Sequence, residues 1–245
     1  RSLIISDVPG DNPADIASGI TAAENTSGLD AIKILKKYHI SISDQTLNFL
    51  KEEPLVVPPN SKHLSKTENI VIASGKTSIN AAKNYALSLG YDVKCIGYNL
   101  EGDAQLLGKK LSKIAIDHQK SMCSDDNPIL LLSGGECTVN VSGSGEGGPN
   151  AEFALSEAIS LNGRPGISLL AGDTDGIDGK GTAAGALVTP STLRKASDID
   201  VDPQMYLQNS DSHSFFKLID SQLITGPTLT NVNDFRAFMI RPFRN

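Results

Sequence analysis

The chain has 245 residues, of which 39% are hydrophobic and 20% charged, a composition typical of a globular protein with a substantial core. Its net charge of −6 argues against nucleic acid as the main partner. No stretch approaches the roughly 18 apolar residues that a membrane-spanning helix needs. Three widely spaced cysteines, Cys95, Cys123 and Cys137, form no zinc or disulfide pattern and indicate a reducing cytoplasm.

The chain starts without methionine and enters a predicted strand at once, over residues 3–6. That start is typical of a fragment, so we expect a first domain to continue upstream. A polar turn over residues 7–19 follows, and apolar residues at helical spacing predict helices over 29–38 and 44–51. The proline-rich run 54–60 breaks regular structure and is the best candidate for a linker.

Beyond residue 60 the pattern alternates between strands and helices. We predict strands at 70–73, 93–97, 129–132, 138–141, 167–171, 223–225 and 235–240, and helices at 78–89, 101–118, 150–161 and 203–220. Such alternation favours an α/β fold with a largely parallel or mixed sheet flanked by helices. The glycines at 134 and 135 allow a hairpin between the third and fourth of these strands.

The glycine-rich segment 142–150 lies between a predicted strand and a predicted helix. Gly143, Gly145 and Gly148 match G-x-G-x-x-G, a spacing that lets backbone amides approach phosphate at the start of a helix. The motif alone is weak, because the acidic partner of a dinucleotide-binding fold is not at its expected place. A flexible loop without a ligand is the alternative.

An acidic segment follows the predicted strand 167–171. Asp173, Asp175 and Asp178 are separated by glycines, and their oxygens suit a hard cation such as Mg²⁺. Aspartates in turns often bond only to their own backbone, which is the alternative here. The position directly after a strand favours a functional site, since ligands bind at the carboxyl ends of strands in α/β sheets.

Two further loops also follow predicted strands. Residues 224–234 crowd hydroxyl and amide side chains around a Gly-Pro turn, a composition able to line a nucleotide or phosphate pocket. Residues 6–11 place Asp7 and Asp11 where they can bind a metal or a substrate hydroxyl, although a plain turn is equally consistent. We expect the acidic segment and the 224–234 loop to lie side by side at the end of a central strand. Residues 74–77 resemble a P-loop, but Ile70 stands where its first glycine belongs.

Taken together these segments resemble the class II glycerate kinase family, some members of which are called hydroxypyruvate reductases. The resemblance is carried, in the family's order, by residues 6–11, 16–19, 132–136, 145–148, 150, 152–155, 171–179, 225–228 and 230–234. It therefore spans nearly the whole chain. Several motifs in order are far more specific than any one of them.

The resemblance implies two α/β domains with the active site in the cleft between them. Residues 1–60 would be the end of the first domain and residues 61–245 the second, with a catalytic lysine upstream of Arg1. It implies ATP and Mg²⁺ as cofactors and phosphorylation of glycerate to 2-phosphoglycerate. We accordingly expect residues 1–245 alone to be inactive, and to pair with the absent half or with a second copy.

The resemblance also implies roles for individual residues. Asp175 and Asp173 would be the catalytic carboxylates and the metal ligands. The expected substrate- or phosphate-binding residues are Gly134, Gly135, Glu136, Gly145, Gly147, Gly148, Asn150, Asp7 and Asp11. The expected nucleotide-binding residues are Thr225, Gly226, Thr228, Thr230, Asn231 and Asn233.

The chain departs from the family pattern at one functional position. The family usually carries arginine after the double glycine, and this chain has Pro149. Loss of the guanidinium removes a bidentate anion-binding group. Ala151 and Ile20 also stand where glutamine and proline are common. Two other functions stay open: an NAD(P)H-dependent hydroxypyruvate reductase, and a non-catalytic protein that binds a nucleotide or hydroxy acid.

Overall fold

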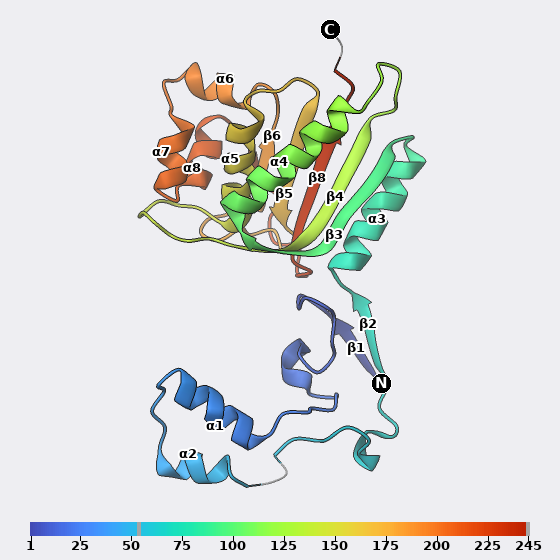
Figure 1. Cartoon of the computed structure of the whole chain (residues 1–245), viewed down its shortest axis with the longest axis vertical. Coiled ribbons are helices and arrows are strands. Elements are labelled where there is room, and N and C mark those ends of the chain that lie inside the picture. The colour runs from blue at the N-terminus through green and yellow to red at the C-terminus, as the bar shows by residue number, and fades with distance from the viewer. Residues whose placement is uncertain (53–54, 244–245) are drawn as a thin grey trace. The chain divides into compact units, whose positions relative to one another are not determined.

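The computed structural model describes residues 1–52 and 55–243, so Pro54 of the predicted linker lies outside the described residues. The chain folds into two compact units (Figure 1). The smaller comprises Arg1–Ile4 and Asp11–Ile72, and the larger comprises Ile5–Gly10 and Ala73–Asn245. Among the helices of the described residues, none is long and apolar enough to span a membrane.

In the smaller unit, short elements surround little core. Strands β1 (Ser2–Ile5) and β2 (Asn69–Ala73) form a two-stranded sheet. Between these strands the chain forms helices α1 (Gly28–Lys37) and α2 (Asp44–Phe49) and the 3₁₀ turns η1 (Ile16–Gly19) and η2 (Lys62–Leu64). Ser27 and Asp30 form a reciprocal capping box at the start of α1, which fixes where that helix begins. Among the described hydrophobic residues of this unit, Ile16 and Ile32 are the buried ones.

A six-stranded sheet forms the centre of the larger unit. Its strands are β3 (Asp92–Asp103), β4 (Ile129–Thr138), β5 (Ile167–Asp173), β6 (Gly185–Val188), β7 (Gln222–Leu223) and β8 (Asp234–Ile240), in the order β3-β4-β8-β5-β6-β7. The predicted α/β class with a mixed sheet is confirmed. The largely parallel version is wrong, because among the described residues of this six-stranded sheet β3 and β4 are the one pair that runs in parallel. The last strand, β8, inserts between β4 and β5 and runs antiparallel to both.

Helices cover both faces of this sheet (Figure 1). They are α3 (Gly75–Ser88), α4 (Ala104–Lys120), α5 (Pro149–Leu161), α6 (Thr192–Ser197), α7 (Pro203–Gln208) and α8 (Ser212–Leu218). Helices α4 and α5 pack against each other and share a hydrophobic core with Leu131 of β4. A side chain at Gly134 would instead meet Ile79 of α3, and since alternate residues of a strand face opposite sides, α3 covers the other face.

Two predictions in this unit were wrong in detail. The expected hairpin over 129–141 is one continuous strand, β4, in which Gly135 lies against the backbone of Leu100 on β3 with a positive φ of 127°. The expected helix 203–220 is broken into α7 and α8 at Ser210, whose φ is also positive, at 51°. Strand β6 and helix α6 were not predicted, because each is short and lacks a clear period.

Candidate active site

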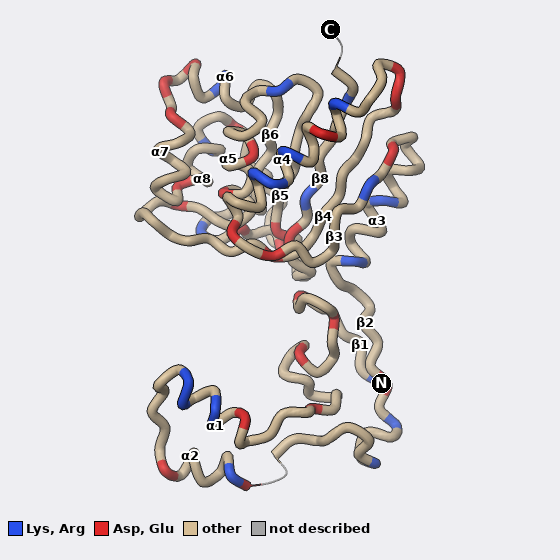
Figure 2. The backbone as a smooth tube through the Cα atoms, viewed as in Figure 1, with Lys and Arg blue, Asp and Glu red and all other residues tan. Residues whose placement is uncertain are grey.

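Carboxylates gather where the central strands end. Strand β5 ends at Asp173, which pairs across the sheet with Asp234 at the start of β8, and Asp234 in turn faces Gly135 of β4. Burial and the charges of Asp234 and Asp7 raise the pKa of Glu136, the next residue of β4. Figure 2 shows several acidic positions, in red, at the lower end of the strands of the larger unit. Such crowding of negative charge favours a bound cation or a shared proton.

The acidic loop and the 224–234 loop lie side by side at this edge, as predicted. The Thr228 amide donates to the Asp175 carbonyl at 2.9 Å, and the Thr174 hydroxyl donates to the Asn233 carbonyl at 2.7 Å. The Val232 amide donates to the Thr174 hydroxyl at 2.9 Å. Gly176 packs so tightly that a side chain there would collide with the Gly226 carbonyl and the Thr225 hydroxyl. Hydrogen bonds between the acidic loop and the 224–234 loop therefore hold the two loops together as one structure.

Within the 224–234 loop, the polar side chains largely shape the backbone. The Thr228 hydroxyl donates to the Thr230 carbonyl at 3.0 Å. The Asn231 carboxamide oxygen accepts from the Asn233 amide at 2.8 Å, which supports the positive φ of 67° at Asn233. The loop is thus held in one conformation beside the carboxylates.

Asp173 and Asp175 are half-buried and adjoin each other. The Asp173 carboxylate accepts the Asp175 amide at 3.0 Å, and the Asp175 carboxylate accepts the Ile177 amide at 2.7 Å. Burial raises the pKa of Asp173 to about 7; the Asp175 amide opposes this shift, while the charges of Asp175 and Asp234 add to it. A carboxyl group titrating near neutrality can exchange a proton or bind a cation.

The carboxylates near Asp173 fit a Mg²⁺ ion that would share its ligands with bound phosphates. In the described part of the chain, no three His, Cys, Asp or Glu side chains converge on a common metal position. Mg²⁺ does not need such a group, since proteins usually bind it through one or two carboxylates, waters and substrate phosphates. The mutual repulsion of Asp173, Asp175 and Asp234 is what such an ion would relieve.

Asp178, the third carboxylate of the acidic loop, has a structural role. It is buried and accepts the Asn150 amide at 2.9 Å and the Ala151 amide at 2.8 Å, so it caps α5. Its carboxylate also lies 3.2 Å from Nε2 of the buried His213. Burial alone would lower the pKa of His213, but the adjacent Asp178 outweighs it and raises that pKa. The Asp178 carboxylate therefore already neutralises the partial positive charge at the N-terminus of α5.

A buried ionic network lies beneath this edge. The Asn150 side chain donates to Asp234 at 2.6 Å and to Asp178 at 3.3 Å, joining the two carboxylates. The fully buried Arg236 bonds to Asp234 and to the Cys137 sulfur, and its guanidinium lies over the Phe153 ring at 4.9 Å. Burial raises the pKa of Asp234 despite the opposing charge of Arg236. Asn150, predicted to bind ligand, connects these carboxylates.

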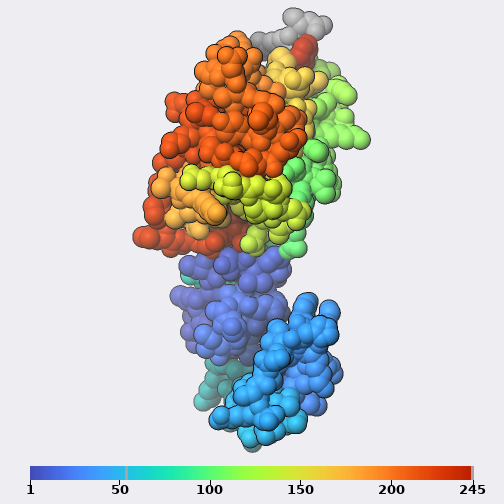
Figure 3. All heavy atoms as spheres, turned by 90° about the vertical axis from the view of Figure 1, so that its left-hand side faces the viewer, coloured from blue at the N-terminus to red at the C-terminus, as the bar shows by residue number. Residues whose placement is uncertain are grey.

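The glycine-rich loop packs onto the turn between α7 and α8. Figure 3 shows it as a yellow-green band beneath the orange helices. The Gly145 amide donates to the Asn209 carbonyl at 3.1 Å, and the Glu146 amide donates to the Asp211 carboxylate at 2.9 Å. A side chain at Gly145 would collide with Asp211, and one at Gly148 with Asp178. These glycines thus permit close packing within the protein, and several of their neighbours' amides are not free for phosphate.

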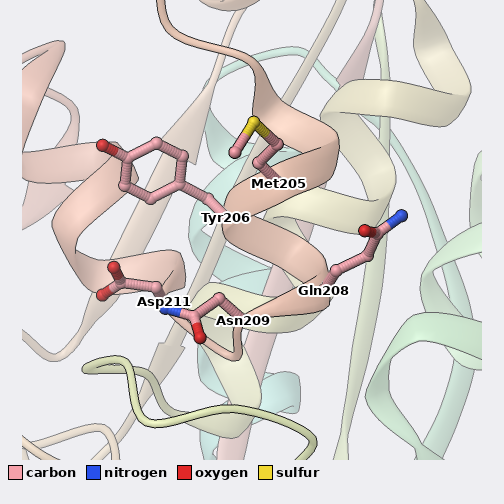
Figure 4. A pocket seen from close by; sticks show the side chains of 5 residues that line it. All are labelled: Met205, Tyr206, Gln208, Asn209 and Asp211. Atoms are coloured by element: carbon pink, nitrogen blue, oxygen red, sulfur yellow. The ribbon is translucent and has the colours of Figure 1, made fainter.

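Two of the hollows near this loop lie beside α7 and beside the start of α5. One, of about 530 Å³, lies against α7 and is lined by Met205, Tyr206, Gln208, Asn209 and Asp211 (Figure 4). The other, of about 240 Å³, lies between the glycine-rich loop, the start of α5 and the end of the acidic loop, and includes Gly147, Pro149 and Lys180. Asp7 belongs to the same larger unit as these loops, whereas Asp11 belongs to the smaller one.

The family comparisons agree with the motifs. Residues 129–234 match the MOFRL family, and residues 1–51 match a domain of unknown function, DUF4147. A glycerate kinase from Macaca fascicularis is 30% identical over 285 residues, covering 98% of this chain and 72% of that protein. The chain belongs to the glycerate kinase family.

Other relatives of this family carry two kinds of name. A protein from Agrobacterium vitis, provisionally named hydroxypyruvate reductase, is 41% identical, covering 98% of this chain and 54% of its own length. A D-glycerate 2-kinase from Thermotoga maritima is 37% identical, covering 95% of the chain and 54% of its own length. The crystal structure of a glycerate kinase from Thermotoga maritima is 36% identical with a TM-score of 0.88, covering 97% of the chain and 56% of that one. The chain spans about half the length of these relatives.

Sequence reasoning missed several residues that shape this edge of the family's fold. Arg236, His213 and Lys180 stand alone in the sequence, and no motif marks them. Asp234 is the last residue of the 230–234 motif, but its position opposite Asp173 could not be predicted, because it depends on the insertion of β8 between β4 and β5. The period of two in β8 was a usable signal, since Asp234 and Arg236 share one face of the strand with the buried Phe238 and Ile240.

Proposed function

We propose that the protein containing this chain transfers a phosphoryl group from ATP to glycerate, giving 2-phosphoglycerate. The observation that carries the proposal is the hydrogen-bonded pairing of the acidic loop with the 224–234 loop, through Thr228 and Asp175. It places carboxylates beside a neutral, hydroxyl-rich loop at the end of a central strand. Phosphoryl transfer depends mainly on such positioning and on charge neutralisation.

In this proposal each loop has its own task. Asp175 orients the attacking hydroxyl of glycerate and accepts its proton. Asp173 and Asp175 supply oxygen ligands for Mg²⁺, which when bound neutralises charge on the phosphates of ATP. Thr225, Thr228 and Thr230, with Asn231 and Asn233, line the nucleotide side. Glu136 and Asp7 border the glycerate side.

The same proposal includes the wider setting of the enzyme. Residues 1–60 form the end of a first domain and 61–245 a second, and the complete cleft draws on chain beyond these 245 residues. The partners are small molecules, without nucleic acid or membrane. All three cysteines are free thiols, which supports a reducing, cytoplasmic compartment.

The test is nucleotide selectivity in the purified protein. We expect ADP formation that requires both glycerate and Mg²⁺, with 2-phosphoglycerate as the product identified by NMR. Oxidation of NADH or NADPH by hydroxypyruvate, without ADP formation, would show that the reductase names among the relatives describe this protein instead. Tight binding of nucleotide without either reaction would support the non-catalytic alternative.

A further inference from the structure

A buried amide connects the two loops that bind ligands in the proposed function. The Asn150 Nδ2 donates to the Asp234 carboxylate at 2.6 Å and to the Asp178 carboxylate at 3.3 Å. Asp178 belongs to the acidic loop, and Asp234 ends the 224–234 loop. A carboxamide has two N–H donors, so both are used inside the protein. One side chain of α5 thus bonds to both loops at once.

The Asn150 side chain is closed to solvent. Asn150 is 1% exposed, and its remaining polar side-chain atom, Oδ1, is buried without a hydrogen-bond partner in the described part of the chain. The reverse orientation of the amide would turn its oxygen toward two carboxylates, which would repel it. The contacts of Asn150 are therefore with the protein, although the resemblance to the glycerate kinase family implies that it binds substrate or phosphate.

Arg236 fixes the Asp234 end of this connection. Its guanidinium is fully buried, bonds to the Asp234 carboxylate and to the Cys137 sulfur, and lies over the Phe153 ring. The Asp234 carboxylate also accepts the Cys137 amide at 3.0 Å. Hydrogen bonds to a charged group are stronger than those between neutral groups. Donors from Asn150, Arg236 and Cys137 therefore hold Asp234 in one orientation.

The Asp178 end is fixed through α5 and α8. The Asp178 carboxylate accepts the backbone amides of Asn150 and Ala151 at 2.9 and 2.8 Å, and it lies 3.2 Å from Nε2 of the buried His213. The end of the acidic loop is therefore attached to the same helix that carries the Asn150 side chain.

We propose that Asn150 and Arg236 are positioning residues, which hold the acidic loop and the 224–234 loop at the spacing that ATP and Mg²⁺ require. The inference rests on the proposed function for the identity of these ligands. The proposed metal ligands precede Asp178 in the same loop, so a shift of Asp178 moves them relative to the hydroxyl-rich loop. A misplacement of about 1 Å, caused by a residue that touches no reactant, can slow a reaction about 100-fold.

The experiment measures hydrogen–deuterium exchange by mass spectrometry on the purified, ligand-free protein that contains this chain. Local opening of either loop breaks the bonds of Asn150, so the loss of these bonds makes opening more frequent. Asn150→Ala is expected to raise the exchange rate of peptides covering residues 171–179 and 224–234 about 10- to 100-fold. Exchange at the parent's rate in both peptides would overturn the inference.

Gln119→Ala is the matched control, because it also removes a buried amide with two acceptors. Gln119 is 2% exposed and donates to the backbone carbonyls of Pro165 and Arg241, at the opposite ends of β5 and β8 from the two loops. Its loss should lower the free energy of unfolding in urea, but opening of the loops leaves its bonds intact. Loop exchange should therefore stay within about threefold of the parent. An increase equal to that in Asn150→Ala would indicate a general loss of stability and overturn the inference.

Arg236→Lys tests the other residue without leaving Asp234 beside an uncharged side chain. The ammonium retains the charge, but it lacks the planar guanidinium that lies over Phe153 and bonds to Cys137. Asp234 should be held less firmly, so exchange of the 224–234 peptide should rise about tenfold. Exchange at the parent's rate would overturn the role assigned to Arg236.

Activity and binding separate this inference from the proposed function. If the protein phosphorylates D-glycerate, Asn150→Ala should lower kcat about 10- to 100-fold, because misplaced loops lose the orientation of the reactants, and Gln119→Ala should not. Parental kcat in Asn150→Ala would overturn the inference and leave the proposed function standing. Faster loop exchange in a protein without ATP turnover would support the connection between the loops and overturn the proposed function. A raised Kd for ATP with unchanged exchange in the ligand-free protein would assign Asn150 a direct ligand contact and overturn the inference.

Discussion

At the residue scale, the charged form of the half-buried Asp173 is destabilising, and a bound cation or proton would offset that cost. Asp173 stands beside Asp175 and opposite Asp234, and its pKa is raised to about 7. A structural role would not require three carboxylates at the end of adjoining strands. Carboxylates held together against their repulsion are typical of sites where a cation or a proton is bound.

We predict that Asp173→Asn stabilises the protein at pH 8 and reduces its activity. Because the folded-state pKa is about 7 against 3.8 for the ordinary group, the native state binds more protons between these values. The stabilising effect of the protonated form is complete below about pH 3.8 and is lost as pH rises through 7. Because solvent screens this half-exposed carboxyl and reduces the full linkage value, the variant should gain about 1–2 kcal/mol over the parent between pH 4.5 and pH 8.

Urea unfolding of both proteins at the two pH values measures this gain. An Asp173→Asn protein whose advantage is the same at pH 4.5 and pH 8 would show that Asp173 is not a titrating group in this range. Asp125→Asn, an exposed carboxylate in the turn before β4, is the control and should show no such dependence.

At the scale of elements, α5 depends on a cap from a distant segment. Gly148 stands at its N-cap position and has no side chain, and Asp178 provides the two acceptors instead. The same carboxylate lies beside the buried His213 of α8. One residue thus joins the acidic loop, α5 and α8, which places the acidic loop relative to the core.

We predict that Asp178→Ala lowers the free energy of unfolding by about 3–5 kcal/mol, because it removes a cap and the carboxylate beside the buried His213, whose Nε2 keeps only the backbone carbonyl of residue 178 at 2.6 Å. Asp202→Ala is the matched control. Asp202 caps the short α7 through the Gln204 amide at 2.9 Å but is not part of a buried pair, so its loss should cost about 1 kcal/mol. Equal losses in the two variants, measured by urea unfolding, would contradict the role assigned to Asp178.

The elements also show how far the sequence alone could go. Helices α1, α3, α4 and α5 followed from apolar period and capping residues, and the adjacency of the acidic loop and the 224–234 loop followed from their positions after strands. The path of β4 through Gly134 and Gly135 did not, because glycine pairs usually mark turns; here they admit Leu100 and Ile79. The break between α7 and α8 depends on packing against the glycine-rich loop, which no local pattern records.

At the scale of the whole molecule, the two units differ in how well they bury apolar residues. The larger has a continuous core around α4, α5 and the sheet. In the described part of the smaller unit, Ile20, Phe49 and Tyr38 are exposed, and the buried hydrophobic residues are Ile16 and Ile32. A unit of this size with so small a core gains little stability from burial.

We predict that residues 1–245 alone do not phosphorylate glycerate at a measurable rate. The relatives are about twice as long, and exposed apolar residues of the smaller unit are consistent with packing against further chain. A coupled ATP-consumption assay on purified 1–245, compared with a protein of the relatives' full length, measures this. Robust turnover by 1–245 would place every catalytic residue within it.

The most direct test of the central claim is the rate of ADP formation with D-glycerate, ATP and Mg²⁺, measured for the parent and for Asp175→Asn. We expect glycerate-dependent turnover in the parent and a kcat at least about 100-fold lower in the variant, which loses the carboxylate that orients and deprotonates the hydroxyl. Unfolding curves that coincide would show that the fold is intact. Near-parental turnover in Asp175→Asn would contradict the account.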